Sequence, residues 1–181
     1  SMRSQSLDNI EWIVIDGGSS DSTKDIIQAN NDIIKFWSSK KDSGIYEAWN
    51  KGLIQASGQF VGFLGADDQW ASDESLAELY FLCKARKADF GSAKVDVIDA
   101  SGVFLRQFGS PWCRTSMLNM DVVAHPGMLV SRTLFSSLGN FNQTFKIAGD
   151  YEWLLRIQQQ SAYVFHDKVL VKMAAGGISQ R

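Results

Sequence analysis

Short apolar runs of strand length alternate with amphipathic stretches of helical spacing through the first half of the chain. The strands are expected at residues 11–16, 33–37 and 59–64, and the helices at 22–30, 45–56 and 72–86. The first and third runs are almost continuously apolar, which is typical of strands that are buried on both faces. This alternation predicts an α/β fold with a mixed, mostly parallel sheet flanked by helices.

The second half of the chain is less regular. Residues 90–98 and 103–108 are apolar runs on either side of Asp-Ala-Ser-Gly, a turn sequence that predicts a hairpin. We expect a loop with one helical turn at 112–121, strands at 128–130, 163–165 and 169–173, and helices at 132–138 and 149–160.

Composition narrows the class of protein. With 181 residues, 45% of them hydrophobic and 21% charged, the chain suits one soluble globular domain with a sizeable core. The net charge of −2 provides no basic field, so we expect no nucleic-acid partner. Two cysteines without metal-ligand spacing favour a reducing cytoplasm. The presence of only two histidines argues against a histidine-rich metal site.

Two adjacent carboxylates follow the strand at 59–64. Asp67 and Asp68 therefore lie at the carboxyl end of a buried strand, where ligands gather in open α/β sheets. Neighbouring carboxylates repel each other unless a cation or donors lie beside them, and a divalent metal shared with a substrate diphosphate is a common solution. A solvated turn before a helix is the alternative that the pair alone leaves open.

Four segments stand in a fixed order: EWIVIDGGSSDST (11–23), DSGIYEAWNKG (42–52), FLGADD (63–68), and HPG (125–127) with AGDYEWLLR (148–156). Together they resemble family-2 glycosyltransferases of the GT-A fold. The resemblance implies a single domain over 1–181, with a nucleotide-sugar half in 1–100 and an acceptor half in 101–181. It also implies inverting transfer of a sugar from a nucleoside-diphosphate donor, of the UDP type, to a glycan or lipid-linked acceptor hydroxyl in polysaccharide or cell-surface glycan synthesis.

The resemblance assigns donor-side roles to five residues. Asp16 would bind the nucleobase, and Asp42 would contact ribose or base unless it is a plain turn residue. Asp68 would ligate Mg²⁺ or Mn²⁺ bridging the two phosphates, while Asp67 would take ribose hydroxyls or a metal-bound water. Lys51 would reach the diphosphate or remain solvated.

The resemblance also indicates the acceptor side. Asp150 would be the general base that takes the acceptor proton, and its alternative role is to stabilise the start of its helix. Glu152 is the nearby competitor. Gly149 stands where related sequences often carry an acid. His125 would contact acceptor or pyrophosphate, with a buried structural histidine as the alternative.

The N-terminal region departs from the family pattern, which has a further strand and helix before the strand at 11–16. We therefore expect a truncated gene product or a mis-assigned start. The strands at 12–16 and 60–64 would then flank the gap that the absent strand leaves in the sheet. Either these strands pair directly or another chain fills the gap, and a homo-oligomer is favoured. A non-catalytic remnant that binds nucleotide weakly or serves assembly is the alternative function. We also expect a cytoplasmic protein that associates peripherally with the inner face of the membrane.

Overall fold

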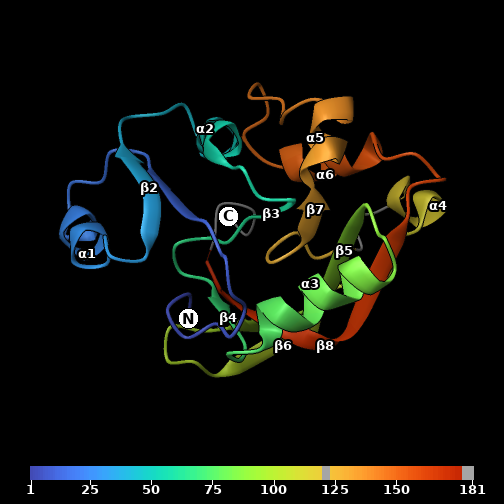
Figure 1. Cartoon of the computed structure of the whole chain (residues 1–181), viewed down its shortest axis with the longest axis horizontal. Helices are drawn as coiled ribbons and strands as arrows, with labels where there is room; N and C mark the ends of the chain where they lie inside the picture. Colours follow the sequence, from blue (N-terminus) through green and yellow to red (C-terminus); the bar gives the residue numbers. More distant parts are fainter. Residues whose placement is uncertain (120–122, 177–181) are drawn as a thin grey trace.

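The apolar runs form two β-sheets in the computed structural model, which describes residues 1–119 and 123–176. The strands are β1 (Trp12–Asp16), β2 (Ile34–Ser39), β3 (Phe60–Gly62), β4 (Gln69–Trp70), β5 (Phe90–Ile98), β6 (Phe104–Phe108), β7 (Leu129–Ser131) and β8 (Tyr163–Ala174). The helices are α1 (Thr23–Ala29), α2 (Ile45–Gln55), α3 (Ser75–Ala85), α4 (Arg114–Met117), α5 (Arg132–Leu138) and α6 (Gly149–Leu155). In Figure 1, α2 lies between the α1–β2 region at the left and the α5–α6 region at the upper right.

The larger sheet has the order β3-β7-β5-β8-β4, with β6 paired to β5, while β1 and β2 form a separate parallel pair. The α/β fold with a mixed sheet is confirmed, but the expectation of mostly parallel pairing is wrong. Among the described residues, only β1–β2 and β5–β8 are parallel, and four pairings are antiparallel. Of these four, only β5–β6 is a hairpin, and the other three antiparallel pairings join strands that are distant in the sequence, so strand–helix alternation along the chain does not fix their direction.

Three elements differ clearly from the prediction. The helix expected at 149–160 ends at Leu155, so α6 has only seven residues. Residues 163–174 form one strand, β8, and not a pair of strands. The register of β8 against β5 jumps from His166 to Val169, so residues 167–168 form a bulge and not a turn. The two-residue strand β4, after the acidic pair, is too short to have a recognisable period.

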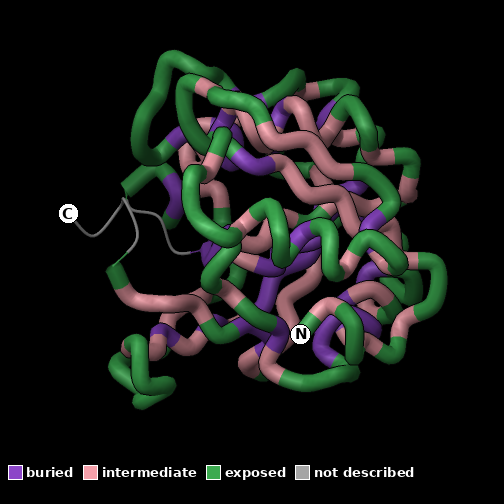
Figure 2. The backbone as a smooth tube through the Cα atoms, turned by 90° about the vertical axis from the view of Figure 1, so that its left-hand side faces the viewer, coloured by how far each residue is buried: buried purple, intermediate pink, exposed green. Residues whose placement is uncertain are grey.

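Two clusters of buried side chains form the core. An aromatic cluster includes Phe90, Phe135 and Trp153, and the last two rings stack with centroids 4.4 Å apart. A second cluster contains Leu79 of α3 and Val95 of β5. Figure 2 shows the buried stretches gathered toward the middle of the molecule and the exposed ones on outer turns. The larger sheet thus has its own core.

The β1–β2 pair is less well buried. Residues 12–15 of β1 are only half-buried, although their sequence is that of a central strand. Among the described residues, β1 pairs only with β2, and β3 pairs only with β7. Direct pairing of β1 with β3, one of the two expected outcomes, therefore does not occur.

Helix α2 is tied to the second half of the chain by a buried side chain. The Asn50 amide donates to the Phe141 carbonyl (2.8 Å), and its oxygen accepts from the Phe141 backbone N–H (3.0 Å). Both polar groups of the amide are thereby satisfied in a buried position. This pairing fixes α2 against the segment that leads to α6.

Candidate functional site

Helix α2 contacts each part of the chain that leads to a candidate residue. Near its start, the Tyr46 hydroxyl bonds to the Asp150 carboxylate. One turn later, Trp49 stacks on His125 with ring centroids 4.7 Å apart. Near its end, Gly52 lies against β1, so the helix passes close enough for ordinary van der Waals contact. The candidate residues of both halves are therefore arranged around one helix.

Asp16 ends β1 and its carboxylate is engaged within the turn that follows. It accepts hydrogen bonds from the Ser19 hydroxyl (2.5 Å) and the Ser39 hydroxyl (2.6 Å), and these lower the pKa of Asp16. Asp42 lies beside Gly17, the residue that follows Asp16, because a Cβ added at Gly17 would lie 3.0 Å from an Asp42 carboxylate oxygen. The segments that follow β1 and β2 therefore bring Asp16 and Asp42 to the same end of this strand pair.

Asp67 and Asp68 both approach Gly65 in the loop after β3. A Cβ at Gly65 would lie 2.7 Å from an Asp68 oxygen and 3.3 Å from an Asp67 oxygen, so the bare glycine makes room for the pair. Asp68 accepts from the backbone N–H groups of Gly65 (3.1 Å) and Ala174 (3.2 Å). Burial, with a smaller contribution from the Asp67 charge, raises the pKa of Asp68.

The acidic pair suits a hard divalent cation. Its donors are carboxylate oxygens only, and burial raises the pKa of Asp68. No set of three His, Cys, Asp or Glu side chains among the described residues converges as a closed metal site. Mg²⁺ in particular is often bound by one or two carboxylates with substrate phosphates supplying further oxygens, so an incomplete protein site fits this chemistry.

Asp150 is the second residue of α6 and points back toward α2. Its Oδ1 accepts a hydrogen bond from the Tyr46 hydroxyl at 3.1 Å, and the Gly149 N–H donates to the same hydroxyl at 2.8 Å. The preceding Ala148 has a left-handed backbone (φ +62°), a conformation that costs of order 1–3 kcal/mol for a residue with a side chain. Such strain persists where surrounding contacts enforce it, and here it lies two residues before the candidate base.

Two other charged candidates form ion pairs along their helices. Glu152, the competitor of Asp150, pairs with Arg156 at 2.5 Å. Lys51 pairs with Glu47 at 2.7 Å, one turn away on α2. Within the part of the chain that the structure describes, neither Glu152 nor Lys51 forms a hydrogen bond or ion pair with Asp150, Asp67 or Asp68.

His125 is buried inside the aromatic cluster and 6% exposed. It stacks on Trp49, and the Phe63 ring lies 5.8 Å away in a nearly parallel orientation. Burial lowers the pKa of His125, and the nearby Asp150 charge opposes that shift. This environment favours the reading of a buried structural histidine over direct contact with acceptor or pyrophosphate.

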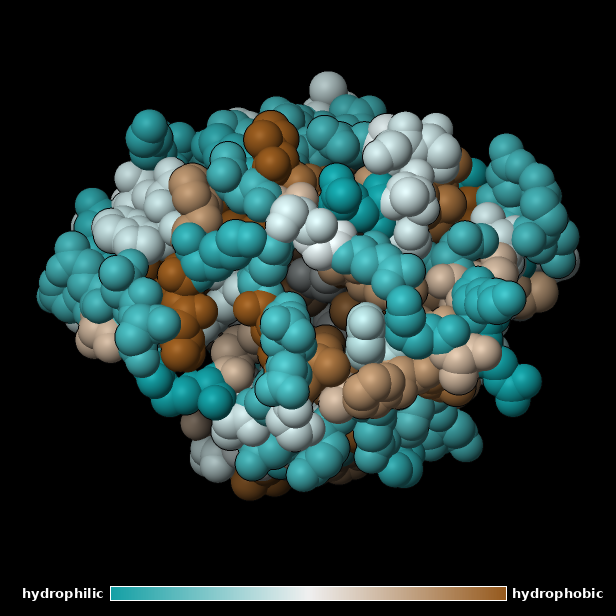
Figure 3. Space-filling model, viewed as in Figure 1, coloured by the Kyte–Doolittle hydropathy of each residue, from teal (hydrophilic) through white to brown (hydrophobic). Residues whose placement is uncertain are grey.

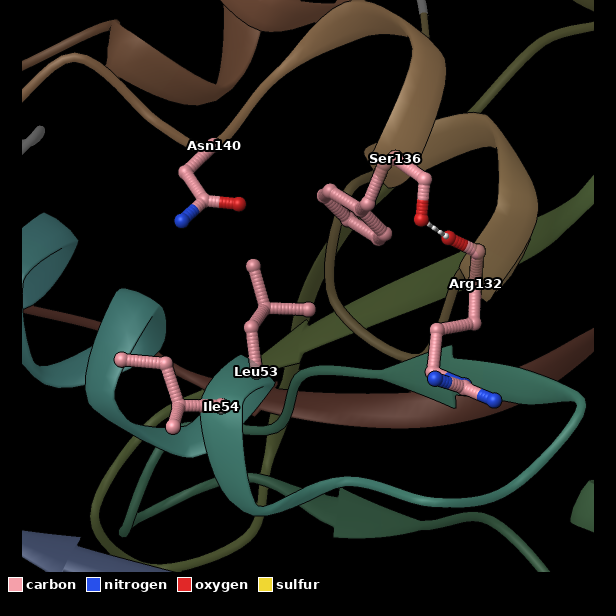
Figure 4. A pocket seen from close by; sticks show the side chains of 6 residues that line it. Leu53, Ile54, Arg132, Ser136 and Asn140 are labelled. Atoms are coloured by element: carbon pink, nitrogen blue, oxygen red, sulfur yellow. Dashed lines mark hydrogen bonds between the residues drawn. The ribbon is translucent and has the colours of Figure 1, made fainter.

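A small pocket lies elsewhere, between the end of α2 and α5. Figure 4 shows Leu53 and Ile54 facing Arg132, Ser136 and Asn140 across it. Its volume of about 150 Å³ is below the roughly 300–1,000 Å³ of typical ligand pockets, and none of the candidate residues lines it. The pocket is therefore not the candidate site. The described surface shows no large apolar patch on the face in Figure 3, where apolar side chains form only small separate areas.

Three residues of the site were not given a role by sequence reasoning. Tyr46 contacts Asp150, Gly65 makes room for the acidic pair, and Gly149 lies against the Tyr46 ring. Their one sequence signal is position, because each lies within one of the four segments that carry the family resemblance.

Comparison with known sequences gives a family match. The sequence model of glycosyl transferase family 2 matches residues 1–133. An uncharacterized glycosyltransferase of Mycobacterium tuberculosis is 30% identical over 154 residues, covering 81% of this chain and 56% of that protein. A PGL/p-HBAD biosynthesis glycosyltransferase of Mycobacterium bovis is 28% identical over 186 residues, covering 99% of this chain and 71% of that protein. The chain thus spans only about half to two thirds of these relatives.

Solved structures share the fold. Staphylococcus aureus TarS 1–349 in complex with UDP-GlcNAc superposes with a TM-score of 0.78 at 20% identity, over 97% of this chain and 53% of that chain. The mannosyltransferase PcManGT from Pyrobaculum calidifontis, in complex with GDP-Man and Mn²⁺, superposes with a TM-score of 0.69 at 16% identity, over 99% of this chain and 52% of that chain. At these identities the likeness shows the GT-A fold.

Proposed function

Because this chain belongs to glycosyl transferase family 2, we propose that it transfers a sugar from a UDP-type donor to an acceptor hydroxyl with inversion. The observation that carries the proposal is the arrangement around α2, which contacts β1 near Asp16 and bonds to Asp150. The acceptor is a glycan or lipid-linked hydroxyl in cell-surface glycan synthesis. The UDP-GlcNAc and GDP-Man complexes of the structural neighbours support a nucleotide-sugar donor.

Asp150 is the general base in this proposal. As the acceptor oxygen bonds to the anomeric carbon, the bond from that carbon to the diphosphate oxygen breaks, and the hydroxyl proton passes to the Asp150 carboxylate. The partial positive charge at the start of α6 favours the anionic form that this role requires. The second acid that related sequences often carry is replaced by Gly149, so Asp150 acts without it.

The donor side is divided between two groups of carboxylates. Asp16 and Asp42 bind the nucleobase and ribose, and Asp16 exchanges a serine hydrogen bond for the base when the donor enters. Asp68, with Asp67 beside it, would hold Mg²⁺ or Mn²⁺. When bound, such a cation stabilises negative charge that develops on the departing diphosphate. The Mn²⁺ in the PcManGT complex supports this assignment.

A second candidate function is nucleotide binding without turnover. The observation that favours it is the separation of the β1–β2 pair, which carries Asp16, from the larger sheet. A donor pocket assembled from two independent sheets would hold nucleotide more loosely.

Calorimetric titration with UDP and Mn²⁺ tests the proposal. We expect binding that strengthens when Mn²⁺ is added, together with release of UDP from a UDP-sugar. Binding without any release of UDP would support the second candidate, and no binding of UDP with or without Mn²⁺ would contradict both. GDP is the matched control, because a preference for UDP must come from the base site near Asp16.

We further propose that chains associate through the unpaired edges of β1 and β3. Both strands are apolar and half-buried, and unpaired edges of such strands readily accept another strand.

We also propose that the protein lies in the cytoplasm, at the inner face of the membrane. Its two free cysteines support a reducing compartment. Among the described residues, no helix is both long and apolar enough to cross a bilayer.

Sedimentation at increasing protein concentration tests the association. We expect a mass that rises above that of one 181-residue chain. A single monomeric species at high concentration would exclude association through these edges.

A further inference from the structure

The Tyr46 side chain links the first turn of α2 to the start of α6. Tyr46 is 5% exposed, and its hydroxyl contacts two groups 103 and 104 residues away in the sequence. The Gly149 N–H donates to it at 2.8 Å, and the Asp150 carboxylate lies 3.1 Å from it on the other side. One phenol therefore joins the two consecutive residues at the start of α6.

The direction of the two hydrogen bonds is fixed by chemistry. A backbone N–H can only donate, so the Tyr46 oxygen accepts from Gly149 and its single proton points to Asp150. Burial, and next the Asp150 charge, raise the pKa of Tyr46 to about 12. The hydroxyl consequently keeps its proton, and remains a donor to Asp150, across the whole range in which an enzyme works.

The ring of Tyr46 is held as firmly as its hydroxyl. A Cβ at Gly149 would lie 2.8 Å from two ring carbons, so the ring occupies the space that a larger residue at 149 would need. Its other contacts are Trp49 (centroids 5.5 Å apart, edge-on) and Phe141 (6.0 Å). A ring confined in this way presents its hydroxyl to Asp150 from one fixed direction.

We propose that Tyr46 is a positioning residue for Asp150. Its hydroxyl donates a hydrogen bond to the carboxylate and so holds the carboxylate in one orientation. The inference rests on the proposed role of Asp150 as general base. It also explains why glycine stands at position 149, since the phenol and a side chain at that position exclude each other.

The test is Tyr46→Phe, which keeps the ring and removes only the hydroxyl. Tyr163→Phe is the matched control, because Tyr163 is also a core tyrosine whose hydroxyl bonds to one side chain, Ser92, at 2.8 Å. The first readout is the ¹³C NMR signal of the Asp150 carboxyl carbon at one neutral pH, assigned by its loss in Asp150→Asn. We expect this signal to move in Tyr46→Phe, because the carboxylate loses its hydrogen bond from the Tyr46 hydroxyl, and to stay in place in Tyr163→Phe.

The second readout is release of UDP from UDP-GlcNAc with water as acceptor. In Tyr46→Phe we expect kcat to fall roughly tenfold, part of the 10²- to 10⁴-fold that a general base contributes, with KM for the donor unchanged. In the Asp150→Asn background, Tyr46→Phe should cause no further loss, because residues that act through one another are not additive.

The outcomes separate the two hypotheses. An unchanged Asp150 carboxyl signal in Tyr46→Phe, or an equal loss of turnover from Tyr46→Phe in both backgrounds, would overturn the positioning role. A changed signal together with full turnover in Asp150→Asn would leave the Tyr46–Asp150 contact intact and remove Asp150 as the base.

Discussion

Replacing Asp150 with asparagine is expected to lower turnover by roughly 10²-fold or more while donor binding stays nearly unchanged. Asparagine has almost the same shape and can still accept from the Tyr46 hydroxyl, so the packing of α6 against α2 is preserved. What it lacks is a lone pair basic enough to take the acceptor proton. The measurement is kcat by UDP release, together with UDP affinity by calorimetry.

Glu152→Gln is the matched control for that experiment. It removes a carboxylate two residues further along α6, one that pairs with Arg156 and has no bond to Tyr46. We expect turnover to be retained. Equal losses of activity, donor affinity and thermal stability in Asp150→Asn would instead show that Asp150 serves to stabilise the start of its helix.

Replacing Asp68 with alanine is expected to abolish the strengthening of UDP binding by Mn²⁺. The substitution removes the half-buried member of the acidic pair and leaves Asp67 as a single exposed ligand. UDP should still bind weakly through the base and ribose contacts near Asp16. Asp73→Ala, which removes an exposed carboxylate on the other side of β4, should keep the full metal effect.

The metal effect should also depend on pH in a defined direction. A protonated carboxylic acid is a poor ligand, so protons compete with Mn²⁺ for Asp68. Because the pKa of Asp68 is raised, this competition begins at a higher pH than for an ordinary aspartate as the solution is acidified. Retention of the metal effect in Asp68→Ala, at any pH, would remove Asp68 from the set of ligands.

The sequence predicted those helices and strands that depend on residues close together along the chain. The apolar run at 12–16 and the helical spacing of α2 appear at nearly the expected boundaries, because each depends on side chains within a few residues. The bulge at 167–168 could not be predicted, since polar residues between two apolar runs look the same in a bulge and in a turn. Its cause is the partner strand β5, which is distant in sequence.

The residues of the candidate site also fall into those that the sequence could indicate and those whose contacts it could not. Asp67 and Asp68 could be selected from their place after an apolar run, and Asp150 from the family resemblance. The Tyr46–Asp150 bond joins residues 104 positions apart, and a tyrosine in the first turn of a helix looks like any core aromatic. The Glu47–Lys51 ion pair, in contrast, is local information, because Glu and Lys four residues apart on a predicted helix face each other.

In the proposed function, the separation of β1–β2 from the larger sheet would let the donor side open without the rest of the fold. The two core clusters include no side chain of β1, α1 or β2 as a buried member, so opening the donor side leaves both clusters intact. Local opening of this kind requires only a fraction of the free energy of global unfolding. Asp16 and Asp42 would then leave the site while Asp68 and Asp150 stay in place, and a bound nucleotide would act as the clamp that holds the two sheets together.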